Sequence, residues 1–96
     1  MLIQCSNFLF SAHALKAMID RNINTKDILE VINHGEIIAN YFDDKPYPSF
    51  LFLKFVHSEP THVVLAHNSE DNTCIIITCY HPAATLWDAE FKNKIR

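Results

Sequence analysis

Glycine is almost absent from this sequence, since only Gly35 occurs among its 96 residues. The loops that cradle nucleotide phosphates in P-loop and Rossmann proteins need several glycines, so that the backbone can approach the phosphates closely. One glycine cannot build such a loop. The sequence therefore excludes ATP-dependent and dinucleotide-dependent chemistry of these kinds, and we expect no cofactor.

Cysteine is also scarce, with three residues and no C-x-x-C pair. Cys74 and Cys79 lie five positions apart in one expected strand and so point to opposite faces, where they cannot reach each other. We therefore expect Cys5, Cys74 and Cys79 to be free thiols in a reducing compartment. No apolar run approaches the ~18 residues of a membrane span, and no signal peptide is recognisable. These absences predict a cytoplasmic protein without a membrane partner.

An excess of positive charge is missing as well, because the formal net charge is −3. Domains that coat nucleic acid through a general electrostatic field are usually strongly basic. The sequence excludes that class of protein, although a local basic patch remains compatible with it. Three cations gather at residues 92–96, namely Lys92, Lys94 and Arg96.

Hydrophobic residues make up 49% of the sequence, which is enough for one core and predicts a single α+β domain over residues 1–96. Ser11 is a good N-cap for a helix over Ala12–Arg21, and Asn24 or Thr25 caps a second helix over Thr25–His34. Gly35 then stands where a left-handed C-cap would end that helix. The first helix has an expected buried stripe of four residues, Ala14, Leu15, Met18 and Ile19.

After Gly35 the apolar period becomes strand-like and predicts four strands, Glu36–Phe42, Phe50–His57, His62–His67 and Thr73–Tyr80. Short turns, among them Ser58–Thr61, join them into a mostly antiparallel sheet on which the two helices pack. Met1–Cys5 is a weak candidate for a further edge strand. Trp87 and Phe91 at i,i+4 spacing predict a short C-terminal helix that docks on the sheet.

Histidine is the residue most able to exchange protons near neutral pH, and the sequence has six. His13 lies in the first turn of the first helix, opposite its apolar stripe, where it is either a neutral base or an exposed residue without a task. His62 opens a strand and is either at the rim of a cleft or a structural core residue. Thr78 and Tyr80 share one face of the last strand, where packing is again the alternative. No metal-ligand motif is present, so we expect no metal site.

Six motifs in one order resemble a bacterial family labelled domain of unknown function 4258, over about residues 10 to 92. They are FSAHA with Met18 and Arg21, HGEII with Tyr41, DDKPYPS, PTHVV, IIITCYHP, and finally Trp87 with Phe91. That family is in turn similar to the RelE, ParE and BrnT-like toxins. The resemblance implies a RelE-like fold of two helices against an antiparallel sheet.

The same resemblance implies a toxin-like, metal-independent endoribonuclease that cleaves RNA by attack of its own 2′-hydroxyl. Such chemistry needs a base, an acid and a cation. His13 and His62 are the candidates for base and acid in either order, Arg21 for the cation, and Thr78 and Tyr80 for orienting the phosphate. The expected partners are a cognate antitoxin and RNA, in some toxins on the ribosome, and a homodimer is compatible with the sequence.

The alternative is a non-catalytic domain that dimerises or binds a protein through a sheet edge or the Pro46–Ser49 loop. Two departures from the family pattern favour it. Ala17 stands where the family usually has arginine, and His81 stands where it usually has another basic residue.

Overall fold

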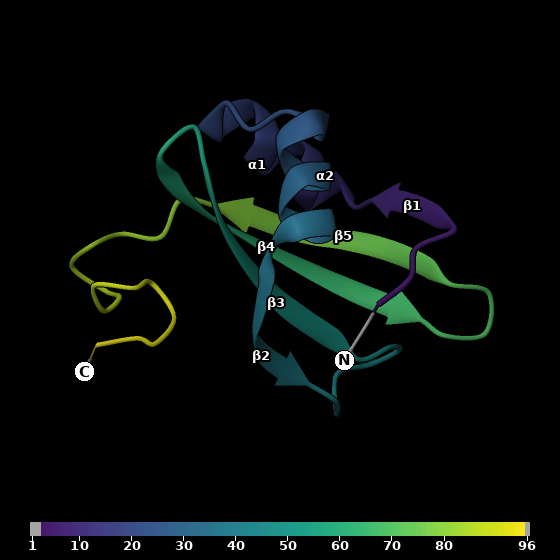
Figure 1. Cartoon of the computed structure of the whole chain (residues 1–96). Coiled ribbons are helices and arrows are strands. Elements are labelled where there is room, and N and C mark those ends of the chain that lie inside the picture. Colours follow the sequence, from purple (N-terminus) through teal and green to yellow (C-terminus); the bar gives the residue numbers. More distant parts are fainter. Residues whose placement is uncertain (1–2, 96) are drawn as a thin grey trace.

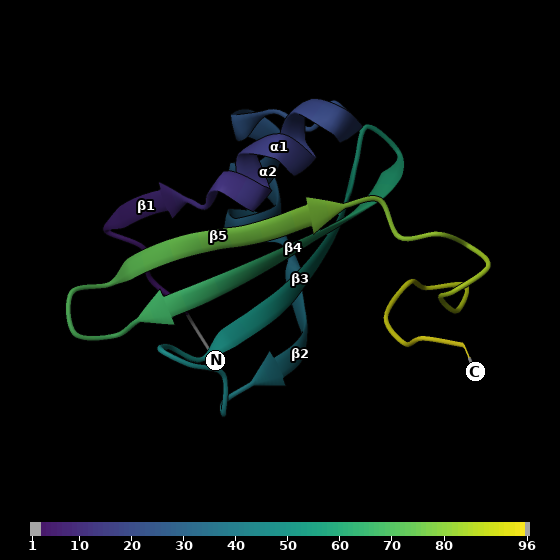
Figure 2. The same ribbon diagram turned by 180° about the vertical axis from the view of Figure 1, so that it is seen from behind.

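The computed structural model describes residues 3–95 as two helices and one five-stranded sheet (Figure 1). Both helices lie on the same face of the sheet (Figure 2). β1 runs parallel to β5, and every other neighbouring pair is antiparallel, in the order β1-β5-β4-β3-β2. The elements are β1 (Asn7–Phe10), α1 (Ala12–Arg21), α2 (Thr25–His34), β2 (Glu36–Tyr41), β3 (Ser49–Val56), β4 (Glu59–Asn68) and β5 (Thr73–Tyr80).

The predicted architecture is therefore wrong, because the sheet is mixed and has five strands, and no helix follows it in the described residues. The missed strand is β1, which pairs Asn7 with Thr73 and Phe10 with Ile76. Its side chains alternate between exposed and half-buried, and Phe8 and Phe10 pack against the core. The candidate edge strand Met1–Cys5 is not one: residues 3–5 are irregular, and residues 1–2 lie outside the described part of the chain.

Both helices have their predicted bounds, and Asn24, one of the two candidates, is the N-cap of α2. The Ser11 hydroxyl accepts a hydrogen bond from the Ala14 amide at 3.0 Å, which satisfies one of the free donors of the first turn of α1. The buried stripe of α1 differs from the prediction, however. Leu15 is 49% exposed and Ile19 is 81% exposed, whereas the small Ala14 and Ala17 are buried. The helix thus packs on β5 through its alanines, which allow a close approach.

Gly35 is not a left-handed cap, since its φ of −84° and ψ of 179° are those of extended backbone. Its amide donates to the Val31 carbonyl at 2.8 Å. A Cβ at this position would lie 2.3 Å from that carbonyl oxygen and 2.8 Å from the carbonyl oxygen of Leu53. Glycine is required here because α2 passes close to β3, and not because of its backbone angles.

Residues 82–95 form turns instead of the predicted helix. Phe91 has a left-handed φ of 61°, and Trp87 and Lys94 form an isolated antiparallel bridge. The Trp87 ring is 7% exposed and packs edge-on against His62, with 4.5 Å between ring centroids. Trp87 and Phe91 therefore belong to a loop that folds back over His62, near the start of β4.

The prediction of three free thiols is also wrong. Cys5 and Cys74 form a disulfide that ties the segment before β1 to β5, and Cys79 is a free, buried cysteine. Burial raises the pKa of the Cys79 thiol, which keeps it protonated. Cys74 and Cys79 both belong to the core, because a register shift at Val64/Leu65 adds one residue to β5 and breaks its alternation.

Neither of the helices in residues 3–95 has the length and apolar character needed to cross a membrane.

Candidate functional site

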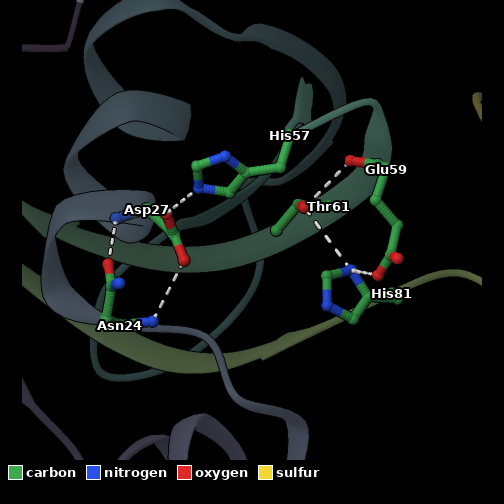
Figure 3. A network of polar contacts seen from close by, with 6 residues as sticks. All are labelled: Asn24, Asp27, His57, Glu59, Thr61 and His81. Carbon is green, nitrogen blue, oxygen red and sulfur yellow. Dashed lines mark hydrogen bonds and ion pairs between the residues drawn. The ribbon is translucent and has the colours of Figure 1, made fainter.

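A surface pocket of about 240 Å³ opens where the end of α1 and the start of α2 meet the β3–β4 hairpin and the end of β5. Side chains that can exchange protons or carry charge line it, and Figure 3 draws the polar contacts of several of them. The polar lining residues are Arg21, Asn22, Asp27, His57, Glu59, Thr61 and His81.

His57 reaches this pocket because it forms the β3–β4 turn together with Ser58, and not the predicted Ser58–Thr61. Both turn residues have positive φ, 53° for His57 and 67° for Ser58. Two consecutive left-handed residues are typical of the type I′ hairpin, which normally uses asparagine and glycine. Histidine and serine have a Cβ atom, so a left-handed backbone is energetically unfavourable for both of them in that turn. Strain of this kind is often found where a side chain has a functional position.

Asp27 links the cap of α2 to the His57 imidazole. One carboxylate oxygen accepts from the Asn24 amide at 3.2 Å, while the Asn24 side chain accepts from the Asp27 amide at 2.8 Å. The other oxygen lies 3.3 Å from His57 Nε2 (Figure 3). The capping box therefore holds this carboxylate in place, and it in turn orients an imidazole that is otherwise exposed.

His81 follows the last residue of β5 and is fixed through Nδ1. This nitrogen lies 3.1 Å from the Pro60 carbonyl oxygen and 3.0 Å from a carboxylate oxygen of Glu59. A carbonyl oxygen only accepts, so Nδ1 carries the proton and donates it. In the neutral ring Nε2 is then an unprotonated acceptor. Thr61, which is buried, donates to the Glu59 carbonyl and completes the support around the ring.

Arg21 lines the pocket from the last turn of α1. The lining thus combines one guanidinium with the carboxylates of Asp27 and Glu59 and with two imidazoles. It becomes net positive only when both imidazoles are protonated. Such a pocket can accept a proton, donate a proton and stabilise an anion, provided that the two histidines are in different protonation states.

The five residues predicted from sequence fall into three separate places. Arg21 lies in the pocket, but His13 is at the other end of α1, eight residues or about 12 Å away along the helix axis. His13 Nε2 contacts the Thr78 hydroxyl at 3.1 Å, at the edge of β5. The structure therefore brings His13 and Thr78 together, at an exposed site outside the pocket.

His62 and Tyr80 form the other predicted pair, opposite each other on β4 and β5. His62 is completely buried and Nε2 donates to the Phe91 carbonyl at 2.8 Å, so Nδ1 accepts from the Tyr80 hydroxyl at 3.3 Å. Burial lowers the pKa of His62, although its bond to Phe91 opposes this, and burial raises the pKa of Tyr80. With both nitrogens occupied, His62 has the geometry of a structural histidine, which was the alternative to a catalytic role.

Sequence reasoning missed His57 and His81 as site residues. His57 was considered only as part of a possible metal site, and His81 only as a departure from the family pattern. No strong signal was available for the turn, because a two-residue hairpin is usually marked by asparagine or aspartate with glycine and not by histidine with serine. Among residues 3–95 no group of three or more histidine, cysteine or acidic side chains is arranged to hold a metal ion.

Comparison with known families supports the resemblance seen in the motifs. A family model described as "Domain of unknown function (DUF4258)" matches residues 10–81, well over half of the chain. The chain belongs to this family. Comparison with curated proteins gave no match, and comparison with solved structures gave none either. The similarity to RelE and ParE-like toxins is thus not part of what the family match establishes.

The DUF4258 region contains the whole candidate site and ends at His81 itself. The two departures from the family pattern lie in different places, one in the core and one in the pocket. Ala17 is buried on the face of α1 that packs on the sheet, so the chain has no cation there. His81 lines the same pocket as Arg21, so this departure places an imidazole at the candidate site.

Proposed function

We propose that this DUF4258 protein is a metal-independent endoribonuclease of the toxin–antitoxin kind, acting at the pocket of Arg21, His57 and His81. A single observation carries the proposal: two imidazoles, each held by a carboxylate, line one pocket with a guanidinium. Cleavage of RNA by its own 2′-hydroxyl needs these three components and no others. The pocket replaces His13 and His62 as the proposed source of base and acid.

In the proposed reaction His81 is the base, because Nδ1 is protonated and Nε2 is available to accept the 2′-hydroxyl proton. The 2′-oxygen attacks the adjacent phosphorus and forms a new P–O bond. Protonated His57, paired with Asp27, gives its proton to the 5′-oxygen as the P–O5′ bond breaks. The products are a 2′,3′-cyclic phosphate and a 5′-hydroxyl. Arg21 stabilises the negative charge that develops on the phosphorane.

The test is cleavage of a labelled RNA by the purified protein in the presence of EDTA. We expect products with 2′,3′-cyclic phosphate ends, and no cleavage where a 2′-deoxynucleotide replaces the ribonucleotide at the cleaved bond. His81→Ala and His57→Ala should each lower the rate about 10²–10⁴-fold, the usual contribution of a general base or acid. His67→Ala is the matched control, because His67 lies eight residues along β4 from Glu59 and contacts Asn72 instead.

His13→Ala separates this proposal from the site expected from sequence. If His13→Ala abolishes cleavage while His81→Ala does not, catalysis takes place at the edge of β5 and the proposed pocket is wrong. Activity that disappears with EDTA, or that survives in the His57→Ala/His81→Ala double variant, would also contradict the mechanism. Induction of the protein in a bacterial host should arrest growth, and the double variant should not.

A second candidate function is a non-catalytic interaction domain, favoured by the exposed ridge of α1. Leu15 and Ile19 are 49% and 81% exposed and lie one turn apart on the same helix face. Two large exposed aliphatic side chains on one helix face are a common feature of protein interfaces. Under the main proposal a cognate antitoxin is the partner. A protein that binds an antitoxin but cleaves no RNA in any condition would favour the second candidate.

A further inference from the structure

The proposed catalytic pocket is the first of three grooves that lie next to one another along β3. The second groove has a volume of about 490 Å³ and shares with the pocket the side chains of Asp27, Val56 and His57. The third has a volume of about 480 Å³ and shares Lys54 and Phe55 with the second. Since neighbouring grooves share lining residues, the three lie in a row along β3 and define one path over its surface.

This path follows a stretch of β3 that has no neighbouring strand on one side. β2 begins opposite Leu53, where Glu36 pairs with it, so residues 54–56 extend beyond β2. α2 lines one side of the second groove, and residues 89–92 line part of the third. Figure 1 shows α2 above the sheet and β2 at the opposite end of β3 from the β3–β4 turn. An open strand edge between two walls suits a linear ligand.

An exposed aromatic ring stands in the middle of the path. Phe55 is 50% exposed and lines both outer grooves. Its ring contacts Phe91 edge-on, with 6.0 Å between centroids. Successive bases of a single-stranded nucleic acid stack on exposed aromatic side chains in this way, whatever their sequence.

The charges along the two outer grooves allow phosphate to bind but do not attract it strongly. Lys26, Lys54 and Lys92 line the grooves, and acidic side chains outnumber them there. Lys54 lies 3.7 Å from Glu30, and Lys92 lies 3.2 Å from Glu36. Ion pairs between exposed side chains contribute little net stability, so a phosphate can replace the carboxylate at small cost. Stacking on Phe55 then adds affinity that these charges do not supply.

We infer that the two outer grooves bind the single-stranded RNA on one side of the cleaved bond, with a base stacked on Phe55 and a phosphate at Lys54. This inference rests on the proposed function and names the form of RNA that the site accepts. It assigns the grooves to unpaired RNA, because a duplex does not expose the base faces that Phe55 would contact.

Binding is tested without cleavage by using a fluorescein-labelled, 2′-O-methylated oligouridine, which lacks the attacking hydroxyl. Phe55→Ala should weaken binding about tenfold at low salt, and Phe55→Trp should retain it. Phe42→Ala is the matched control, because Phe42 is 60% exposed and lines none of the three grooves. Urea unfolding of each variant checks that the contact with Phe91 is not needed for folding.

Salt dependence tests the phosphate contact independently. Lys54→Ala should reduce the slope of log K against log salt by about 0.7, the value for one phosphate contact in a single strand. Lys16→Ala is the control, since Lys16 is an exposed lysine on α1 that pairs with Asp20 much as Lys54 pairs with Glu30. Its slope should equal that of the unmodified protein.

Cleavage of two substrates separates this inference from the proposed function. A dinucleoside monophosphate fills only the pocket, so Phe55→Ala should cleave it at the normal rate but cleave a longer RNA about tenfold more slowly. If Phe55→Ala cleaved the longer RNA as fast as the unmodified protein does, the groove assignment would be overturned and the catalytic proposal would stand. Loss of antitoxin binding without loss of oligouridine binding would assign the grooves to a protein, and would overturn the inference as well.

Discussion

Replacing the buried His62 with glutamine should make the stability of the protein less dependent on acid. In the folded protein, burial keeps the pKa of His62 below its ordinary value of about 6.5. In the unfolded chain the same ring titrates at about 6.5. Below that pH the unfolded state therefore binds a proton that the folded state does not, and acid favours unfolding. Above it both states are neutral and His62 contributes no pH dependence.

The size of the pH effect depends on the difference between the pKa of His62 in the unfolded and in the folded state. Between the unfolded and the folded pKa of His62, each pH unit lowers the free energy of unfolding by about 1.4 kcal/mol. His62→Gln removes the titration but also the ring contacts with Trp87 and Tyr80, each worth about 0.5–1.5 kcal/mol. We therefore expect the variant to be about 1–3 kcal/mol less stable near pH 8. This deficit should shrink as the pH falls below 6.5, by at most about 1.4 kcal/mol per pH unit.

The assay is urea unfolding of both proteins at several pH values, followed by tryptophan fluorescence, which reports on Trp87 directly. The other histidines are the same in both proteins, so the difference between the two curves isolates His62. His67→Gln provides the control, because His67 is only partly buried. A stability deficit that stays constant or grows on acidification would show that His62 is charged in the folded protein, and would refute the assignment of Nδ1 as an acceptor.

Three further predictions concern the backbone and the cysteines. Gly35→Ala should lower the free energy of unfolding by about 1–3 kcal/mol, because its Cβ would collide with two carbonyl oxygens; a urea midpoint equal to that of the unmodified protein would contradict this. Ser58→Gly should raise stability by about 0.5–1 kcal/mol, because glycine accepts the left-handed backbone, and calorimetry should show a higher Tm. Thiol titration of the denatured, unreduced protein should count one thiol, that of Cys79, and a count of three would exclude the disulfide.

The helices were predictable because their signals are local. Ser11 and the Asn24–Asp27 capping box determine where each helix begins through residues three positions apart. β1 was not predictable in the same way. It has four residues, and its only strand partner among residues 3–95 is β5, which lies more than sixty positions further along the chain. The bulge in β5 is likewise a property of pairing with β4, and without it Cys74 and Cys79 seemed to face opposite sides.

The candidate site was only partly predictable for the same reason. Arg21 was identified because it ends a helix and belongs to a motif. His57 and His81 come from a turn and from the residue after a strand, and only the three-dimensional structure shows that they share a pocket. The spacing of Trp87 and Phe91 fits a helix, but Phe91 has a left-handed φ of 61° and the segment is a turn, from which Trp87 packs on His62 and the Phe91 carbonyl accepts from that ring.

The parallel pairing of β1 with β5 determines the order in which the sheet can be completed during synthesis. β1 is translated before β2, β3 and β4, yet its partner residues Thr73–Ile76 emerge from the ribosome only after those three strands. Those three strands pair through short hairpins and can form while β1 is still unpaired. The nascent chain therefore carries an unpaired apolar strand with Phe8 and Phe10 until β5 has been made. Such a segment is a natural binding site for chaperones and a point at which newly made copies of the chain can aggregate.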